Sequence, residues 1–401
     1  MRILIINQPV GNRGDESAHR AFVRQLVKDC PNDTITVAFF GEVKESFQPI
    51  QVEAPNLRYE FIPFERGKIR LARFAISHQC VNLLVNILPA YKKLDRLIKR
   101  ADKVICAPGG ICLGKFMNWD HLIWLKRAQY YKKCMAYYSR SFGPFETGDH
   151  YKELFNRESL SVLKYMDFLS IRDKKTMDLA DTLGLKYTPS IDTAFLENPV
   201  ADLSSLKNVL TDNYIVLVPN SLIWQPAFSK ANANDINAFY CAVIDLINMK
   251  FNNCKIIMMP QLFGQGAKND VIYFQRIKEL SKANNIEVLP DTYSSDIQQN
   301  IIKGSKLVIG ARYHSIVFAI NNERPFVSLS YEHKMFGLLS ILGLDDRQVD
   351  ITQIGTQQFS KDIALQSIES IIDRNVEMSL FHQNAHKTAL NCYNMFAQWL
   401  R

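Results

Sequence analysis

Apolar and polar positions follow two periodicities along this chain. Between amphipathic segments such as DESAHRAFVRQLVKD and DINAFYCAVIDLINMKF lie runs of apolar, often β-branched residues with the length of buried strands. They are RILIIN (2–7), ITVAFF (35–40), KVICAP (103–108), CMAYYS (134–139), FLSIR (168–172), YIVLVP (214–219), KIIMMP (255–260), KLVIGA (306–311) and PFVSLS (325–330). Buried strands that alternate with amphipathic helices predict an α/β fold with parallel sheets flanked by helices.

The alternation weakens near residues 195–212, where neither a strand nor a strong helix is indicated. A chain of 401 residues is long for a single hydrophobic core. We therefore predict two Rossmann-like domains facing a cleft, over residues 1–200 and 201–375. The last stretch, 376–401, is predicted to be a helix that packs back on the first domain.

Composition indicates a soluble, reduced protein. Hydrophobic residues make up 47% and charged residues 22% of the chain. The eight cysteines are scattered without a CxxC pair, which favours free thiols over disulfides or zinc, and no carboxylate cluster predicts a metal. No signal peptide is recognisable, because Met1 is followed at once by the first strand. These features predict a cytoplasmic location.

The net charge of +8 is concentrated in residues 58–103, which hold eleven Lys and Arg against four Asp and Glu. The middle of this segment, residues 74–91, has no charged residue but is too polar to span a bilayer. It could lie on an anionic membrane or cover a lipid-bearing substrate, or it could be a core helix with solvated basic ends. A second basic stretch, 124–140, is typical of a helix running into a buried strand, and we expect no nucleic-acid binding.

Ligands of parallel sheets bind beyond the carboxyl ends of the strands, so the loops there are the candidate sites. After the first strand, Gly11, Asn12, Gly14 and Asp15 form a turn in which Asp15 or Ser17 could cap the next helix. The spacing departs from GxGxxG, so it only weakly indicates a dinucleotide site.

Paired glycines, Gly109 and Gly110, follow another strand. Their N–H groups could face an anion or a sugar, although a plain tight turn explains them equally well.

Two further strand ends carry charged residues. Arg172 follows FLSI and needs a negative partner, which could be Asp173 or a ligand anion. Asp192, near the domain break, could orient a sugar hydroxyl or cap the following turn.

The most specific feature is GARYHS (310–315), which puts Arg312 and His314 where a helix follows a strand. A helix N-terminus favours anions, so two cationic or titratable side chains there call for a negative partner. We therefore predict an anion site at this turn.

Taken in order, GNRGDES, APGGICLG, SFGPF, SIRD, SIDTAF and GARYHSIVFAINNERPFVSLSYEHK resemble the polysaccharide pyruvyl transferase family over roughly residues 1–340. The resemblance implies a GT-B-like fold, with the acceptor on the first domain and the donor on the second. It implies transfer of a pyruvyl group from phosphoenolpyruvate to a sugar of a surface polysaccharide, such as an exopolysaccharide or capsule, or of its lipid-linked precursor, to form a cyclic ketal. No cofactor is implied, because phosphoenolpyruvate is a co-substrate.

The family's motif histidine and donor-binding arginine correspond to His314 and Arg312, with Tyr313 in place of the usual leucine. Arg172 is a looser match. Two guanidinium groups can grip the carboxylate and phosphate of the donor. A histidine suits proton delivery near neutral pH, although His314 could instead be a phosphate ligand.

Two alternatives remain at this stage. A GT-B glycosyltransferase using a nucleotide sugar would bind a nucleoside diphosphate, and a non-catalytic glycan-binding scaffold would bind without turnover. The acceptor could be free or linked to polyprenyl diphosphate, which would bring the protein to the inner face of the cell membrane.

Overall fold

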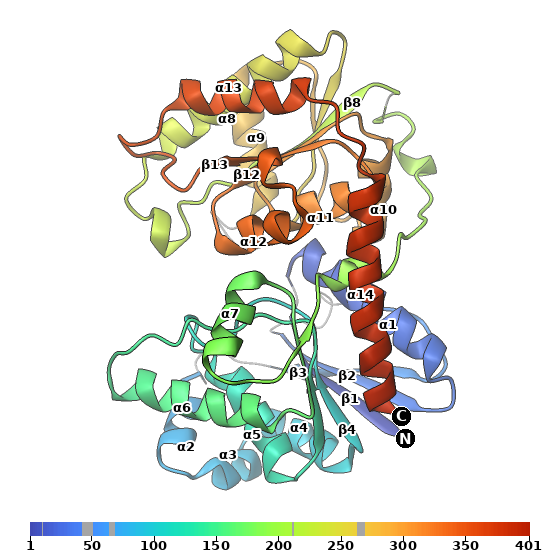
Figure 1. Cartoon of the computed structure of the whole chain (residues 1–401), viewed down its shortest axis with the longest axis vertical. Coiled ribbons are helices and arrows are strands. Elements are labelled where there is room, and N and C mark those ends of the chain that lie inside the picture. Colours follow the sequence, from blue (N-terminus) through green and yellow to red (C-terminus); the bar gives the residue numbers. More distant parts are fainter. Residues whose placement is uncertain (10, 42–50, 64–68, 211, 263–268) are drawn as a thin grey trace. The chain divides into compact units, whose positions relative to one another are not determined.

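The computed structural model describes the whole chain except residues 10, 42–50, 64–68, 211 and 263–268 (Figure 1). Two compact units account for it. Unit 1 comprises Met1–Val10, Asp15–Leu196 and Lys387–Arg401, and unit 2 comprises Gly11–Gly14 and Glu197–His386. The short segment after the first strand thus belongs to unit 2, although the chain on both sides of it belongs to unit 1.

Unit 1 is built on a parallel sheet of seven strands in the order β3-β2-β1-β4-β5-β6-β7. In that order the strands are Leu57–Pro63, Thr34–Gly41, Arg2–Gln8, Lys103–Cys106, Cys134–Tyr137, Phe168–Ile171 and Thr188–Pro189. Six of the seven residues of β1 are buried, as expected of a central strand covered on both faces.

The helices of unit 1 lie on both faces of this sheet (Figure 1). They are α1 (Arg13–Asp29), α2 (Ile69–Ser77), α3 (Val81–Ile87), α4 (Pro89–Arg100), α5 (Trp119–Tyr130), α6 (His150–Tyr165), α7 (Lys174–Thr182) and the last part of α14 (Ser379–Leu400). Local capping fixes where several begin. The side chains of Asn118, Asp149 and Asp173 accept backbone N–H bonds at the starts of α5, α6 and α7.

The end of α14 is held to unit 1 by aromatic packing. Phe396 lies with its ring centroid 4.8 Å from that of Tyr138, 5.5 Å from that of Phe22 and 5.6 Å from that of Phe168. Tyr138 follows β5, Phe22 belongs to α1 and Phe168 belongs to β6. The helix therefore covers one face of the core of unit 1.

Unit 2 is likewise built on a parallel sheet, here of six strands in the order β10-β9-β8-β11-β12-β13. The strands in that order are Ile286–Val288, Lys255–Met258, Tyr214–Val218, Val308–Gly310, Phe326–Ser330 and Gln348–Asp350. Its helices are α8 (Ala233–Lys250), α9 (Asp270–Ser281), α10 (Ser295–Gly304), α11 (Tyr313–Asn321), α12 (His333–Leu342), α13 (Lys361–Asp373) and the start of α14.

The prediction of parallel sheets flanked by helices is confirmed. All nine predicted strands form. Four further strands, β3, β7, β10 and β13, were missed, and each lies at an edge of its sheet. The uncharged stretch 74–91 is not one helix, because it contributes to α2, α3 and α4.

Candidate functional site

The predicted anion site lies where β11 turns into α11 in unit 2. Arg312 occupies the N-cap position with an extended backbone, and its side chain makes no capping bond. His314 is the one residue of α11 whose side chain is not fully buried. The turn before it is tight, because a Cβ at Gly310 would overlap the hydroxyl of Ser315, which bonds to the carbonyl of Arg312 at 2.5 Å.

Asp270, at the start of α9, is the negative partner of Arg312. Both side chains are buried, and the second oxygen of Asp270 accepts the N–H groups of Gln261 and Leu262 at 3.0 and 2.9 Å. Burial acts to lower the pKa of Arg312, but Asp270 together with Tyr331 and Tyr240 outweighs it and the pKa is raised. The chain itself therefore supplies a counter-charge that the sequence reasoning assigned to a ligand.

Asp270 does not use the whole guanidinium group. The Nε atom of Arg312 is buried and has no hydrogen-bond partner among the described residues. The ring of Trp224 lies 5.9 Å from the guanidinium carbon. Arg312 is thus held in place by Asp270, and one of its N–H groups is left without a partner among the described residues.

The segment Gly11–Gly14 meets this site within unit 2. The N–H of Arg13 bonds to the carbonyl of Gln261 at 3.0 Å, and the Arg13 side chain donates to the carbonyl of Asp291. Asn12 forms a bridge with Leu262. Gly14 lies against His314 so closely that a Cβ would overlap the imidazole ring. Two distant sequence motifs are therefore brought together.

Among the remaining residues predicted here, Tyr313 is buried, with its ring edge-on to His314 and Lys334 Nζ 5.5 Å from its centre. Gly11 has a φ of +108°, which favours glycine. Asp15 lies in the first turn of α1, which begins at Arg13.

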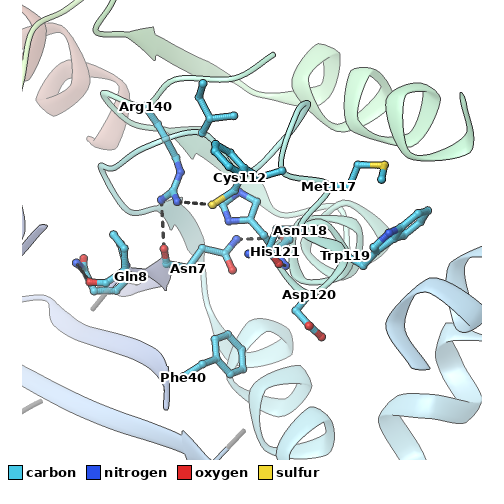
Figure 2. Close-up of a pocket in the computed structure, with 13 residues that line it drawn as sticks. Asn7, Gln8, Phe40, Cys112, Met117, Asn118, Trp119, Asp120, His121 and Arg140 are labelled. Carbon is cyan, nitrogen blue, oxygen red and sulfur yellow. Dashed lines mark hydrogen bonds between the residues drawn. The ribbon is translucent and has the colours of Figure 1, made fainter. Parts of the chain in front are cut away.

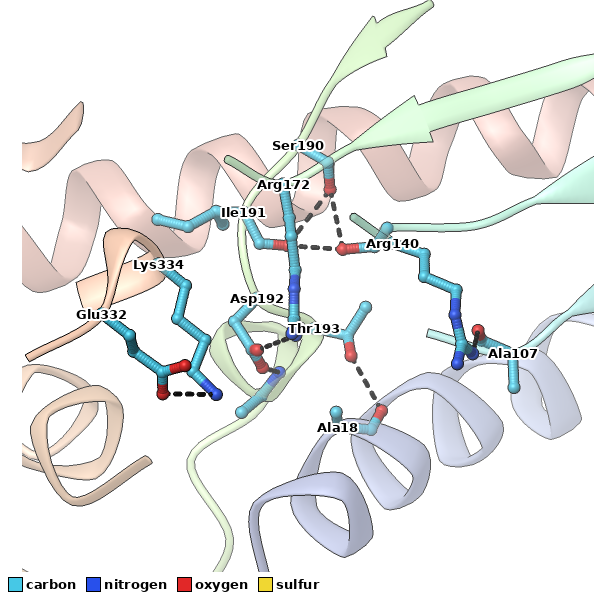
Figure 3. Close-up of polar contacts among 12 residues, drawn as sticks. Ala18, Ala107, Arg140, Arg172, Ser190, Ile191, Asp192, Thr193, Glu332 and Lys334 are labelled. Atoms are coloured by element: carbon cyan, nitrogen blue, oxygen red, sulfur yellow. Dashed lines mark hydrogen bonds and ion pairs between the residues drawn. The ribbon is translucent and has the colours of Figure 1, made fainter. Parts of the chain in front are cut away.

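Arg172 and Asp192 form a buried ion pair in unit 1, with Nη1 to Oδ2 at 2.5 Å (Figure 3). The other oxygen of Asp192 accepts the N–H of Ala194 at 3.0 Å, in the short helix η3 (Thr193–Leu196). Asp173, which the sequence offered as the partner of Arg172, instead caps α7 by accepting the N–H of Thr176 at 2.9 Å. Asp192 therefore combines the expected cap with an unexpected charge pair.

Gly109, the first of the paired glycines, packs against Arg140, which the sequence reasoning overlooked. A Cβ at Gly109 would lie 3.1 Å from Nη1 of Arg140, whereas one at Gly110 would meet nothing within 4 Å. Arg140 is 1% exposed and donates to the carbonyls of Asn7 and Ala107 at 3.2 and 2.8 Å (Figures 2 and 3). Its Nη2 lies 3.0 Å from Sγ of Cys112.

Arg140 borders a pocket of about 460 Å³ in unit 1 (Figure 2). The lining comes from the ends of β1, β2, β4 and β5 and from the start of α5: Asn7, Gln8, Pro9, Phe40, Ile111, Cys112, Phe116, Met117, Asn118, Trp119, Asp120, His121 and Arg140. It lies at the carboxyl ends of the strands, where ligands of such sheets bind.

Asp120 and His121 are the titratable side chains that α5 brings to this pocket. Burial raises the pKa of Asp120 to about 6, against the opposing effect of a hydrogen bond from the Tyr91 hydroxyl. Burial and the nearby Arg140 hold the pKa of His121 well below its usual range, which keeps the ring neutral. Because α5 also carries charged residues such as Lys126, an Asp-His step in its first turn does not stand out in the sequence.

In the described part of the chain, no cluster of three or more His, Cys, Asp or Glu side chains is arranged to hold a metal. Within the same residues, no helix combines the length and apolar character needed to cross a bilayer.

Comparison with known proteins identifies the chain as a transferase of polysaccharide biosynthesis. The family model for polysaccharide pyruvyl transferase matches residues 12–333, and the chain belongs to this family. The chain is also 22% identical over 392 residues to the amylovoran biosynthesis protein AmsJ of Erwinia amylovora, covering 88% of this chain and 89% of that protein.

Solved structures of GT-B enzymes share the fold. The UDP-GlcNAc 2-epimerase of Methanocaldococcus jannaschii is 13% identical with a TM-score of 0.62, over 99% of both chains. Arabidopsis thaliana UGT89C1, solved in complex with UDP, is 12% identical with a TM-score of 0.58, over 99% of this chain and 98% of that one.

Proposed function

We propose that this protein transfers a pyruvyl group from phosphoenolpyruvate to two hydroxyls of a saccharide, forming a cyclic pyruvate ketal. The observation that carries the proposal is the placement of Arg312 and His314 at the start of α11, with Gly14 against the imidazole. A helix N-terminus and an arginine with an unpartnered buried Nε among the described residues suit an anionic donor.

The chemistry follows from the donor. Its methylene carbon takes a proton from His314, and a sugar hydroxyl attacks the oxocarbenium-like carbon that results. A second hydroxyl then displaces phosphate. One hydroxyl proton passes to a base and the other leaves with the phosphate, and His314 regains its proton from solvent. Arg312 binds the donor anion, and Tyr313 shapes the pocket beside it. Arg172 is proposed as a second donor ligand, and no cofactor is required.

The acceptor is proposed to bind unit 1. Of its sequence candidates, Asp15, Gly109, Gly110 and Asp192 lie in unit 1, whereas Gly11, Asn12 and Gly14 belong to unit 2. Support for a lipid-linked acceptor comes from α2 and α3, which pack together. Phe74, Leu83 and Ile87 on these helices are 55%, 59% and 64% exposed. Basic residues flank them, including the exposed Arg70 and Lys92, while residues 64–68 of the basic segment lie outside the described residues.

Exposed apolar side chains beside basic ones suit peripheral contact with an anionic membrane. The proposed location is therefore the cytoplasm, with peripheral contact at the inner face of the cell membrane.

The test is phosphate release from phosphoenolpyruvate across free and lipid-linked galactosides, mannosides and glucosides, with mass spectrometry of the product. We expect acceptor-dependent phosphate release and a ketal on one acceptor class. Thermal shift with phosphoenolpyruvate, UDP and GDP separates the alternative, since a nucleotide-sugar glycosyltransferase would be stabilised by a nucleoside diphosphate. Stabilisation by UDP or GDP, without phosphate release, would overturn the proposal.

A further inference from the structure

The pocket of unit 1 has the composition of a saccharide site. Its volume of about 460 Å³ falls in the range of small-ligand pockets, roughly 300–1,000 Å³. Phe40, Phe116 and Trp119 offer aromatic surface for the apolar face of a sugar ring. The amide oxygen of Asn7 can accept a hydroxyl, whereas the amide of Gln8 is already bonded to Pro9 and His19.

Two polar groups at the pocket retain unused hydrogen-bonding capacity. Arg140 is 1% exposed, and its Nε has no partner among the described residues. Asp120 accepts the Tyr91 hydroxyl through Oδ1, and within the described part of the chain no group donates to its Oδ2. The free carboxylate oxygen favours a hydroxyl-bearing ligand, whereas the unpaired Nε of Arg140 is enclosed by the protein beside the pocket.

The surroundings of Asp120 suit proton transfer. The titratable groups that surround the pocket in the described chain are Tyr91 of α4, His121 of α5, Cys112 of the loop after β4, and Arg140 after β5. Burial is the largest influence on the Asp120 pKa, which it raises to about 6, and Tyr91 acts in the opposite direction. A carboxylate in this range is ionised at neutral pH and is a stronger base than an exposed aspartate.

We infer that this pocket binds the acceptor sugar and that Asp120 accepts the proton of the hydroxyl that attacks the donor. The inference rests on the proposed pyruvyl transfer. In that step the hydroxyl oxygen bonds to the central carbon of phosphoenolpyruvate as its O–H bond breaks, and the proton passes to Oδ2 of Asp120. The proton that His314 adds to the methylene carbon is a separate one.

Binding is measured first, because it needs no turnover. Saturation-transfer NMR with methyl galactosides, mannosides and glucosides should detect binding of one class to the wild type. Trp119→Ala should abolish this signal. Met249→Ala, an exposed change in unit 2, should leave it intact. Because the ionised carboxylate accepts the hydroxyl, binding should weaken below pH ~6 in the wild type but not in Asp120→Asn.

Turnover is measured second. Asp120→Asn should lower kcat by about 10²–10⁴-fold, the usual contribution of a positioned proton acceptor. In the wild type kcat should rise with pH through about 6 and then level off, since the base must be ionised. Tyr91→Phe removes the hydrogen bond that holds this pKa down, so the rise should move to higher pH while the plateau is kept.

Tyr131→Phe is the matched control, because Tyr131 donates to Asp95 at 2.8 Å on the same helix pair but does not line the pocket. Its pH profile should equal that of the wild type. The inference would be overturned if Trp119→Ala bound the sugar as tightly as the wild type. A normal kcat in Asp120→Asn would also overturn it. Sugar binding at this pocket without any phosphate release would instead contradict the proposed function and leave the sugar site standing.

Discussion

The backbone of Gly14 lies directly against the imidazole ring of His314, with no room for a side chain between them. Gly14 is not needed for a positive φ, since its backbone is in the ordinary range at the start of α1. The glycine is therefore required by the close approach of the histidine. Within unit 2, this contact joins the start of α1 to the first turn of α11.

Replacing Gly14 by alanine tests this contact. Alanine is a better helix former than glycine, so the local backbone tolerates the change. The new methyl group must displace His314, and we expect turnover to fall by about tenfold or more, since small misplacements of reacting groups are costly. Gly148→Ala is the control, because a Cβ there meets only the flexible chain of Lys152 on the surface. Equal kcat values for the two variants would contradict the prediction.

The role of His314 is separated by two substitutions. His314→Ala should keep much of the donor affinity and lose about 10²–10⁴-fold in kcat, as expected for a proton donor. His314→Gln can still bond to phosphate but cannot deliver a proton, so it should be equally slow. His382→Gln, on a partly buried histidine that pairs with Glu323, controls for the change of residue type. Substantial kcat in His314→Gln would make His314 a phosphate ligand.

The strands that were predicted from the sequence lie inside the two sheets, whereas those that were missed lie at the edges. Central strands such as β8 are buried along their whole length, so their residues form continuous apolar runs. β3, β7, β10 and β13 lie at sheet edges and are short or mixed, as in LRYEFIP with its exposed Arg58. Because edge strands are partly solvated, they contain polar residues and lack the continuous apolar run by which a buried strand is recognised.

The candidate site divides in the same way. Arg312 and His314 stood out because cations at a helix N-terminus conflict with a local electrostatic rule. Asp270 and Asp120 break no local rule, since acidic residues are ordinary in the first turn of a helix. Their importance comes from burial and from partners far along the chain, Arg312 and Tyr91, which only the fold brings near them.

The Arg312–Asp270 pair predicts a stability effect that must be separated from donor binding. Arg312→Met leaves a buried carboxylate without its counter-charge, and the free energy of unfolding should fall by about 3–5 kcal/mol. Arg312→Met/Asp270→Asn removes the charge as well and should recover part of the loss. Urea denaturation measures both. If Arg312→Met were as stable as the wild type, the charge of Asp270 would be compensated by groups other than Arg312.

Arg172 is tested in two properties at once. Arg172→Met should cost about 3–5 kcal/mol of stability, because it strands Asp192, which is fully buried. If Arg172 also holds the donor as proposed, Arg172→Lys should raise the donor KM by a factor corresponding to about 2–4 kcal/mol. Arg127→Lys is the matched control, since Arg127 forms a comparable ion pair with Asp95 in the same unit, and its donor KM should not change. An unchanged donor KM in Arg172→Lys would leave it a structural residue.

The exposed face of α2 and α3 gives the last prediction. Phe74→Ser/Leu83→Ser/Ile87→Ser should weaken binding to phosphatidylglycerol vesicles by about tenfold or more, because each apolar side chain withdrawn from water is worth on the order of 1 kcal/mol. The matched control is Met249→Ser/Ile363→Ser/Leu380→Ser, which removes equally exposed side chains from unit 2 and should bind like the wild type.

The charges beside this face are tested with Arg70→Glu/Lys92→Glu. This variant should bind less tightly to anionic vesicles, and its difference from the wild type should shrink as salt is added, because the attraction is screened. The acceptor KM should rise for a lipid-linked saccharide but not for a free one, and the donor KM should not change. Lys93 is left intact, since it pairs with Glu60 at 2.7 Å and is less available to a lipid surface. An unchanged KM for the lipid-linked acceptor would contradict the proposal that this basic and apolar face binds the acceptor at a membrane.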